Sequence, residues 1–153
     1  LLSKISNARP KIADYPFTTL NPNLGVVVLD NERQFVAADI PGLIEGASLG
    51  AGLGIKFLRH IERTKVLVHL IDLSLPEPAK RYYNIRNEIG CYDATLLEKP
   101  EIIVGTKIDL SESRNNIQKL GKIADRYFLI SCVTDEGIKP LLEEIWRILT
   151  EGY

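Results

Sequence analysis

Cysteine, methionine and long hydrophobic runs are scarce or missing in this sequence. The two cysteines, Cys91 and Cys132, lie far apart and match no metal-ligand spacing, so they are typical of free thiols in a reducing compartment. No apolar run approaches the roughly 20 residues that a helix needs to cross a membrane. Methionine is absent, and the chain begins at Leu1 within a helical pattern. We therefore expect a fragment whose true N-terminus is missing.

An excess of charge of one sign is missing as well. The chain has 19 Lys and Arg against 20 Asp and Glu, so its formal net charge is −1 and no global basic field points to nucleic acid. A hydrophobic content of 45% and a charged content of 25% are ordinary for a globular protein. The 153 residues are enough for one domain with a sizeable core. We see no repeats and no internal domain boundary.

The first part of the chain predicts a β-hairpin between two long connecting segments. Leu24–Leu29 and Gln34–Asp39 read as strands, and the turn Asp30-Asn31 joins them. Segment 9–23 is polar and carries three prolines, which predicts a long loop of the functional or disordered kind. Segment 42–54 is rich in glycine and predicts a second loop.

Strands and helices alternate in the rest of the chain. We expect strands at Val66–Ile71, Ile102–Val104 and Tyr127–Ile130, and helices at Leu1–Ile5, Ile55–Ile61, Pro78 to about Leu97, Ser113–Asp125 and from Ile138 onward. The run Val66–Ile71 is almost wholly apolar, which suits a central parallel strand covered on both faces. The fold class is therefore α/β: a doubly wound, mostly parallel sheet with one antiparallel hairpin strand.

Polar motifs follow the predicted strands at the ends where open α/β sheets bind ligands. Asp39-Ile40-Pro41-Gly42 follows the hairpin, Thr106-Lys107-Ile108-Asp109 follows a buried strand, and Ser131-Cys132-Val133 follows the last strand. Thr18-Thr19 lies in the loop before the hairpin. An Asp at a strand end can hold Mg²⁺ through water, and a glycine N–H lets a phosphate approach closely. A plain Pro-Gly turn is the alternative interpretation of the first motif.

The order of these motifs looks like that of a P-loop GTPase domain. The stretch Ala13-Asp14-Tyr15-Pro16-Phe17-Thr18-Thr19-Leu20, together with Pro41–Ala47, Gly52–Gly54 and Phe57–Arg63, resembles the Obg family of bacterial GTPases. The resemblance covers essentially the whole chain. In that family the phosphate loop G-x-x-x-x-G-K-[ST] comes immediately before the residue that is Leu1 here. The resemblance thus implies that 1–153 is a G-domain fragment of P-loop NTPase type, without its first strand and phosphate loop.

The resemblance also implies a role for each matching residue around GTP and Mg²⁺. Thr19 would coordinate Mg²⁺ when the γ-phosphate is present, and Asp39 would hold the same ion through water. The N–H of Gly42 would bond the γ-phosphate, so Thr19 and Gly42 are the candidate catalytic residues. The full set of implied nucleotide contacts is Phe17, Thr18, Thr19, Leu20, Asn21, Asp39, Ile40, Pro41, Gly42, Thr106, Lys107, Ile108, Asp109, Ser131, Cys132 and Val133.

Guanine recognition would come from the two later motifs. Asp109 would accept hydrogen bonds from N1–H and the exocyclic amine of guanine, a donor pair that adenine lacks. Lys107 would lay its aliphatic stem on the base. The backbone N–H groups of Ser131 to Val133 would bond the guanine oxygen.

Three residues depart from the common GTPase pattern. Leu43 stands where Ras-like enzymes carry the Gln that orients the attacking water, so intrinsic hydrolysis should be slow or helped by another group; an apolar residue there is usual in the Obg family. Thr106 replaces the common Asn, which puts affinity in doubt but not base choice. Cys132 replaces a small Ala, and a backbone-only contact should tolerate it.

Two residues outside these motifs have plainer interpretations. His69 lies in an apolar strand and is expected to be a satisfied core residue. Asp72 follows the same strand and could be structural, capping the turn after it.

The function implied by the resemblance is Mg²⁺-dependent hydrolysis of GTP to GDP and phosphate by a molecular switch. It further implies a cytoplasmic protein that acts in large ribosomal subunit assembly and stress control, through the full-length protein. We expect the fragment alone to be inactive, because the missing strand would leave its neighbours with unpaired edges. Two alternatives stay open: a nucleotide-free protein-docking module of G-domain fold, and an ATPase, against which Asp109 argues.

Overall fold

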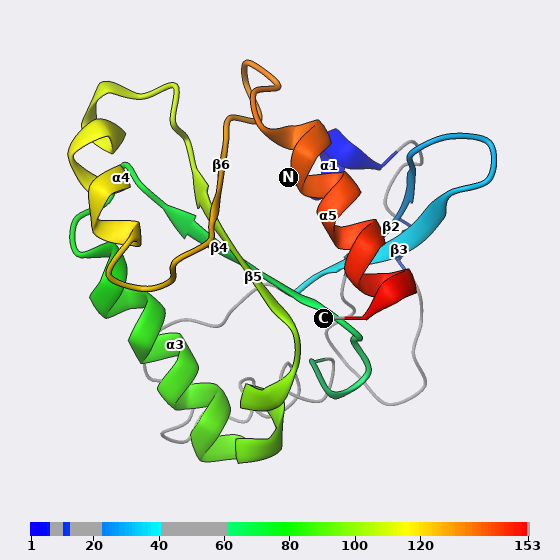
Figure 1. Cartoon of the computed structure of the whole chain (residues 1–153), viewed down its shortest axis with the longest axis horizontal. Coiled ribbons are helices and arrows are strands. Elements are labelled where there is room, and N and C mark those ends of the chain that lie inside the picture. Colours follow the sequence, from blue (N-terminus) through cyan, green and yellow to red (C-terminus); the bar gives the residue numbers. More distant parts are fainter. Residues whose placement is uncertain (7–10, 13–22, 41–60, 153) are drawn as a thin grey trace. The chain divides into compact units, whose positions relative to one another are not determined.

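The computed structural model describes residues 1–6, 11–12, 23–40 and 61–152 (Figure 1). They divide into two compact units, Leu1–Thr64 and Lys65–Tyr153, and each is described here by itself. Most of the predicted loop 9–23, the glycine-rich segment 42–54 and the start of the predicted helix Ile55–Ile61 lie outside the described residues.

The first unit contains an antiparallel sheet of order β1-β2-β3. Its elements are α1 (Leu2–Ile5), β1 (Lys11–Ile12), β2 (Asn23–Val28) and β3 (Gln34–Asp39). The predicted hairpin is confirmed, because β2 and β3 pair antiparallel along their whole length. Strand β1 was not predicted: it is two residues long, and only its pairing with β2 defines it.

The hairpin turn is held by Asp30. Its Oδ1 accepts hydrogen bonds from the backbone N–H groups of Glu32 and Arg33, at 3.1 and 3.0 Å. The Nε of Arg33 donates to Oδ2 at 2.6 Å, and this bond lowers the pKa of the Asp30 carboxyl. The carboxylate of Asp30 thus accepts hydrogen bonds from backbone N–H groups of the turn, and this is a reason why Asp is common in turns.

Helix α1 approaches β2 closely because residue 25 is glycine. A Cβ on Gly25 would lie 2.6 Å from the Cβ of Ser6 and 2.9 Å from a methyl of Leu2. Ser6 also forms an isolated antiparallel bridge to Val27, which is completely buried. A larger residue at position 25 would therefore push the helix off the strand.

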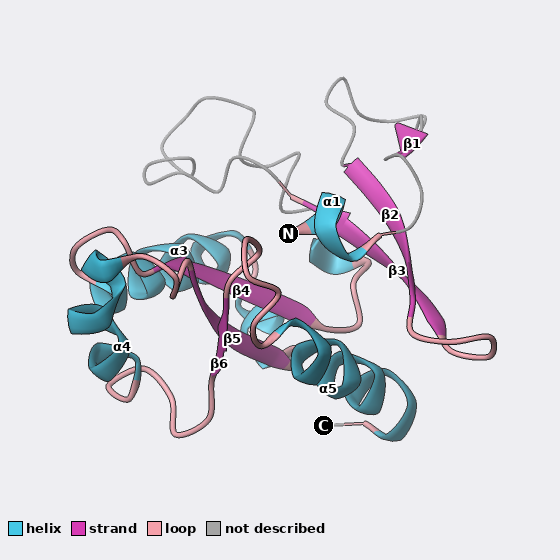
Figure 2. Cartoon of the chain, turned by 90° about the horizontal axis from the view of Figure 1, so that it is seen from above, coloured by secondary structure: helices cyan, strands magenta, loops and turns pink. Residues whose placement is uncertain are grey.

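The second unit contains a parallel sheet of order β4-β5-β6, drawn side by side in Figure 2. Its strands are β4 (Leu67–Asp72), β5 (Glu101–Thr106) and β6 (Phe128–Ile130). Its helical elements are α3 (Pro78–Tyr92), η2 (Ala94–Glu98), η3 (Ser111–Ser113), α4 (Arg114–Leu120) and α5 (Ile138–Glu151). Helices α3 and α4 lie on one side of this sheet and α5 on the other, as Figure 1 shows, so the predicted α/β class is confirmed.

The core of this unit lies between the sheet and helices α3 and α4. It consists of the buried residues Ile71, Leu73, Tyr82, Ile103 and Leu120. Helix α5 buries Leu141, Ile145 and Ile148, whose spacing gives the helix one apolar stripe. The helix starts after Gly137, which has a φ of +72° and would place a Cβ 1.9 Å from the carbonyl oxygen of Leu129. Only glycine fits there.

Strand β4 corrects one sequence prediction. We expected it to be central and covered on both faces, but among the described strands it lies at the edge of the sheet and β5 is central. One of its apolar side chains, Leu70, is 44% exposed, so the strand is not fully covered on both faces within the described residues. An apolar sequence predicts that both faces of a strand are buried, but it does not determine whether other strands pair with both of its edges.

Two helix boundaries also differ from the prediction. Helix α3 ends at Tyr92, because Asp93 adopts an extended backbone and caps η2 by accepting a hydrogen bond from the N–H of Thr95 at 2.9 Å. Helix α4 ends at Leu120 and not at Asp125. Gly121 follows it directly with a φ of −61°, and the poor helix propensity of glycine weakens the continuation of the helix.

His69 is a satisfied core residue, as predicted. Its side chain is 8% exposed, and its Nδ1 lies 2.9 Å from Oε1 of Glu101, whose side chain is 12% exposed. Tyr82 donates to the other oxygen of Glu101 at 3.0 Å, and Arg86 contacts that oxygen at 3.3 Å. This cluster, called here the Glu101 cluster, joins the start of β5 to β4 and α3.

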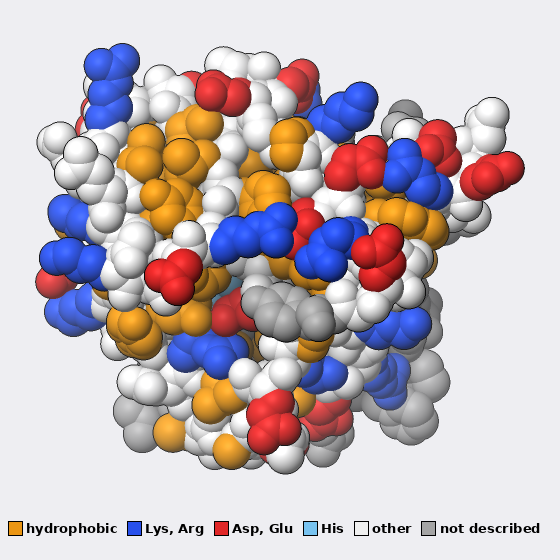
Figure 3. All heavy atoms as spheres, in the orientation of Figure 1, with side chains coloured by type: hydrophobic (Ala, Val, Ile, Leu, Met, Phe, Trp, Pro, Cys, Tyr) orange, Lys and Arg blue, Asp and Glu red, His pale blue; other side chains and the backbone are white. Residues whose placement is uncertain are grey.

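The visible surface carries mixed charge. On the face drawn in Figure 3, Lys and Arg side chains are interspersed with Asp and Glu. This agrees with the net charge of −1 and with the expected lack of a basic field. No helix among the described residues is both long enough and apolar enough to span a bilayer.

Candidate functional site

The candidate site is the edge of the second sheet where its three parallel strands end. In register, Asp72 of β4 lies beside Thr106 of β5, and Thr106 lies beside Ile130 of β6. Parallel strands deliver their carboxyl ends to one edge, so the loops that follow them meet there. The structure thus brings the predicted segments 106–109 and 131–133 together, and it adds Asp72.

Asp109 is held by a completely buried serine. The hydroxyl of Ser131 donates to Oδ1 of Asp109 at 2.6 Å. The same oxygen of Ser131 accepts hydrogen bonds from the backbone N–H groups of Val133 and Thr134, each at 3.1 Å. Asp109 itself is exposed. One of its carboxylate oxygens is thus fixed, while the carboxylate as a whole faces solvent and can accept from a ligand.

The loop after β6 offers a single backbone donor from its first three residues. The N–H of Ser131 donates to the carbonyl of Glu136 at 3.0 Å, and that of Val133 donates to Ser131. The third residue is Cys132, and its backbone N–H has no acceptor in the part of the chain that the structure describes. We predicted backbone contacts to guanine from Ser131, Cys132 and Val133, and among these the N–H of Cys132 is the one that stays available to a ligand in the described part of the chain.

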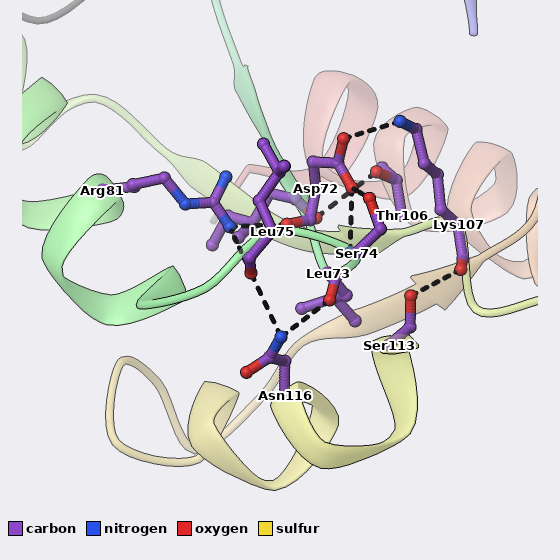
Figure 4. Close-up of polar contacts among 10 residues, drawn as sticks. Asp72, Leu73, Ser74, Leu75, Arg81, Thr106, Lys107, Ser113 and Asn116 are labelled. Carbon is purple, nitrogen blue, oxygen red and sulfur yellow. Dashed lines mark hydrogen bonds and ion pairs between the residues drawn. The ribbon is translucent and has the colours of Figure 1, made fainter. Parts of the chain in front are cut away.

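Lys107 is fixed both along its backbone and at its ammonium. Its backbone is left-handed, with a φ of +63°, and its carbonyl accepts a hydrogen bond from the hydroxyl of the buried Ser113 at 2.7 Å. Its Nζ lies 2.7 Å from Oδ2 of Asp72 (Figure 4). The side chains of Lys107 and Asp72 are 54% and 25% exposed.

Asp72 is ionised and caps the end of β4. Its Oδ1 accepts hydrogen bonds from the N–H and the hydroxyl of Ser74, at 2.9 and 2.6 Å. Burial raises the pKa of the Asp72 carboxyl, but the hydrogen bonds from Lys107 and Ser74 outweigh burial and lower it overall. The predicted capping role of Asp72 is confirmed. Its pairing with Lys107 was not predicted, because no local pattern links residues on two different strands.

The remaining predicted residues fall into three groups, one in the second unit, one in the first unit and one outside the described residues. Thr106 donates through its hydroxyl to the carbonyl of Ile71 at 3.3 Å, and Ile108 donates its N–H to the carbonyl of Ile130 at 3.4 Å. Asp39 is exposed at the end of β3, in the first unit, and Ile40 follows it half-buried. Outside the described residues lie Phe17, Thr18, Thr19, Leu20, Asn21, Pro41, Gly42 and Leu43.

No group of three or more His, Cys, Asp or Glu within the described ranges could hold a metal ion by itself. The predicted water-mediated contact of Asp39 with Mg²⁺ stays a prediction.

Comparison with known proteins identifies the family. A family model described as 50S ribosome-binding GTPase matches residues 1–107. The GTPase Obg of Anaeromyxobacter sp. (strain Fw109-5) is 54% identical over 159 residues, which cover 97% of this chain and 45% of that protein. The GTPase Obg of Chlorobium chlorochromatii (strain CaD3) is 52% identical over 149 residues, covering 97% and 44%. The chain belongs to the Obg-type GTPases. It spans less than half the length of these curated relatives.

The fold of this Obg-type chain is that of a P-loop GTPase domain. A crystal structure of Era in complex with MgGDPNP and nucleotides 1506–1542 of 16S ribosomal RNA matches it with a TM-score of 0.66. The match has 24% sequence identity and covers 95% of this chain and 50% of that chain. At this identity the likeness shows the shared fold.

Proposed function

We propose that this chain is the nucleotide-binding part of a Mg²⁺-dependent GTPase, a molecular switch that hydrolyses GTP to GDP and phosphate. The observation that carries the proposal is the Ser131–Asp109 hydrogen bond beside the N–H of Cys132. It supplies an oriented carboxylate acceptor and a backbone donor at one edge of the sheet. Membership of the Obg family supports the same conclusion.

The chemistry of the edge matches guanine. Asp109 accepts from N1–H and the exocyclic amine, and the N–H of Cys132 donates to the exocyclic carbonyl oxygen of guanine. Adenine carries the opposite pattern, an acceptor at N1 and an amine in place of the oxygen, so it would leave both protein groups unpaired. A backbone donor also explains why a cysteine is tolerated at position 132.

The phosphate side of the proposal rests on the family resemblance. Thr19 and Asp39 hold Mg²⁺, Asp39 through water, and the N–H of Gly42 bonds the γ-phosphate. Loss of the Thr19 contact after hydrolysis would release segment 9–23, which makes that segment the switch. The bound MgGDPNP named for the Era structure is consistent with this requirement for Mg²⁺.

The wider setting of the proposal is a cytoplasmic protein that acts on the large ribosomal subunit during its assembly and in stress control. The description of the family model as a 50S ribosome-binding GTPase supports this partner. Residues 1–153 would be one G domain, completed by the strand and the phosphate loop G-x-x-x-x-G-K-S that the 153 residues do not contain.

The test is isothermal titration of the full-length protein with GDP. Replacing Asp109 by Asn keeps the shape of the side chain but offers guanine a donor where it needs an acceptor. We expect the Kd for GDP to rise about 100-fold or more. Xanthosine diphosphate, which has an oxygen in place of the amine, should regain binding, because the Asn amide can donate to that oxygen.

The matched control is Asp125→Asn, which removes the same charge from an exposed position outside this edge of the sheet. It should leave the Kd for GDP unchanged. An Asp109→Asn protein that binds GDP as the wild type does would overturn the assignment of base recognition.

A further inference from the structure

Asp72 stands at the edge of the sheet beside the candidate guanine contacts, and the proposed function gives it no part in binding. We propose that Asp72 is a positioning residue for the nucleotide base: it holds the ammonium of Lys107 so that the aliphatic stem of Lys107 forms one wall of the guanine site. This inference rests on the proposed function of the same edge. It extends the site to β4, a strand from which no contact was predicted.

The turn that begins at Asp72 is held by side chains from two helices, Arg81 of α3, which is partly buried, and Asn116 of α4, which is buried. The guanidinium of Arg81, on α3, donates to the carbonyl of Asp72 and to that of Leu75 (Figure 4). The amide of the buried Asn116, on α4, donates to the carbonyls of Leu73 and Leu75, at 2.9 and 3.1 Å. The turn after β4 is thereby tied to the core, so the carboxylate of Asp72 is presented in one place.

The side chain of Lys107 needs such an anchor because the backbone of Lys107 is fixed but its side-chain rotamer is not. Ser113 fixes the carbonyl of Lys107, and its left-handed backbone sets the point from which the side chain leaves. The stem of four methylenes has many rotamers, and an exposed lysine samples them all. The contact of 2.7 Å between Nζ and Asp72 selects the rotamers that lie along the edge of the sheet.

The exposure of the Asp72–Lys107 pair indicates that the pair orients the Lys107 side chain more than it stabilises the fold. With 54% of the Lys107 side chain and 25% of the Asp72 side chain exposed, water and salt screen the attraction. Removing the charge of Asp72 should therefore change the melting temperature little. It should change ligand binding more, because the stem would then have to be ordered when the nucleotide arrives.

The test compares four forms of the full-length protein by GDP titration: wild type, Asp72→Asn, Lys107→Met and the double variant. Met keeps an unbranched apolar stem without the ammonium. We expect Asp72→Asn to raise the Kd for GDP roughly three- to tenfold, with the double variant no weaker than Lys107→Met alone, since the effect of Asp72 passes through Lys107. The penalty of Asp72→Asn should also shrink at about 1 M salt, where the wild-type pair is screened.

Ser74→Ala is the matched control. It removes a hydrogen bond to the other oxygen of Asp72 and leaves the pair with Lys107 in place, so the Kd for GDP should stay within about twofold of the wild type. Equal or tighter GDP binding by Asp72→Asn, or an additive loss in the double variant, would overturn the inference. A wild-type protein that fails to bind GDP would instead reject the proposed function.

Discussion

At the scale of single residues, Ser131 fixes the geometry of the candidate site. Its hydroxyl donates to Asp109 and accepts from two backbone N–H groups of the loop after β6. One buried oxygen thus fixes both the carboxylate that would accept from guanine and the loop whose Cys132 N–H would donate to it. A backbone-only role, as expected from the sequence, understates what this side chain does.

Replacing Ser131 by Ala should therefore impair folding and binding together. The backbone N–H groups of the exposed residues Val133 and Thr134 would lose the hydroxyl that accepts from them, and each lost hydrogen bond costs about 0.5–1.5 kcal/mol of unfolding free energy. GDP binding should weaken as well, because Asp109 would no longer be oriented. Denaturant titration measures the first effect and calorimetry with GDP the second.

The control is Ser111→Ala, which removes an exposed hydroxyl that donates to Glu112. It should change the unfolding free energy by less than about 0.5 kcal/mol. A Ser131→Ala protein as stable as this control would show that water replaces the lost hydroxyl.

The residue scale also shows where sequence reasoning stops. Asp109 and Ser131 were singled out because each follows an apolar strand in a recognisable motif. The pair of Asp72 with Lys107 and the support from Asn116 were not, because their partners lie 35 or more positions away or on another element. Contacts of this kind depend on strand order and register, which periodicity does not contain.

At the scale of elements, the Glu101 cluster joins β5 to β4 and α3. Burial raises the pKa of Glu101. The hydrogen bond and charge of His69, the charge of Arg86 and the hydrogen bond from Tyr82 outweigh burial and lower that pKa below the ordinary value. Burial and the charge of Glu101 raise the pKa of Tyr82 to about 12, so its hydroxyl stays protonated and donating across the neutral range. The three elements are thus held by one ionised carboxylate.

This cluster predicts a specific acid sensitivity. A carboxyl whose folded pKa is depressed contributes stability above its unfolded pKa, near 4.5, and loses it as the pH falls through the folded value. Replacing Glu101 by Gln should therefore destabilise the protein by about 3 kcal/mol at neutral pH, and the difference from wild type should shrink below about pH 4.5. Denaturant titration from pH 3 to 8 measures this difference.

Glu77→Gln is the comparison, because the Glu77–Lys80 pair is about two-thirds exposed on both sides. It should cost less than about 0.5 kcal/mol at any pH. A pH-independent cost for Glu101→Gln would mean that packing, and not ionisation, holds the three elements together.

Most elements could be predicted from the sequence because their signals are local. The hairpin has two apolar runs around an Asp-Asn turn, and α5 has one apolar stripe. What failed depended on partners elsewhere in the chain: β1 exists only through β2, and β4 has the composition of a covered strand without a described neighbour on its outer side. The end of α3 failed for a local reason, since Asp93 can cap a new turn as readily as continue a helix.

At the scale of the whole molecule, the described residues form two sheets in two units, where the sequence predicted one doubly wound sheet. The proposed G domain would account for this difference, because the family resemblance implies a strand that precedes Leu1 in sequence and pairs with β3 and β4 in the sheet, and the 153 residues do not contain it. Without a strand that pairs with both β3 and β4, the described strands form two separate sheets.

Residues 1–153 by themselves should therefore unfold in a broad or two-step transition and bind GTP weakly. Scanning calorimetry measures the first property and titration with GTP the second. The same measurements on a chain extended upstream through G-x-x-x-x-G-K-S should give one sharper transition and tight binding. A single cooperative transition together with micromolar affinity for residues 1–153 would contradict this expectation.

Among the described strands β4 has a partner on one edge alone, and this affects how the chain behaves in concentrated solution. An edge strand without Lys or Pro is a template for strands of other copies, and Leu67–Ile71 contains neither. With neither residue type in this stretch, β4 of one molecule can pair with β4 of another. Association of this kind would turn concentrated samples turbid on warming while the helices were still intact.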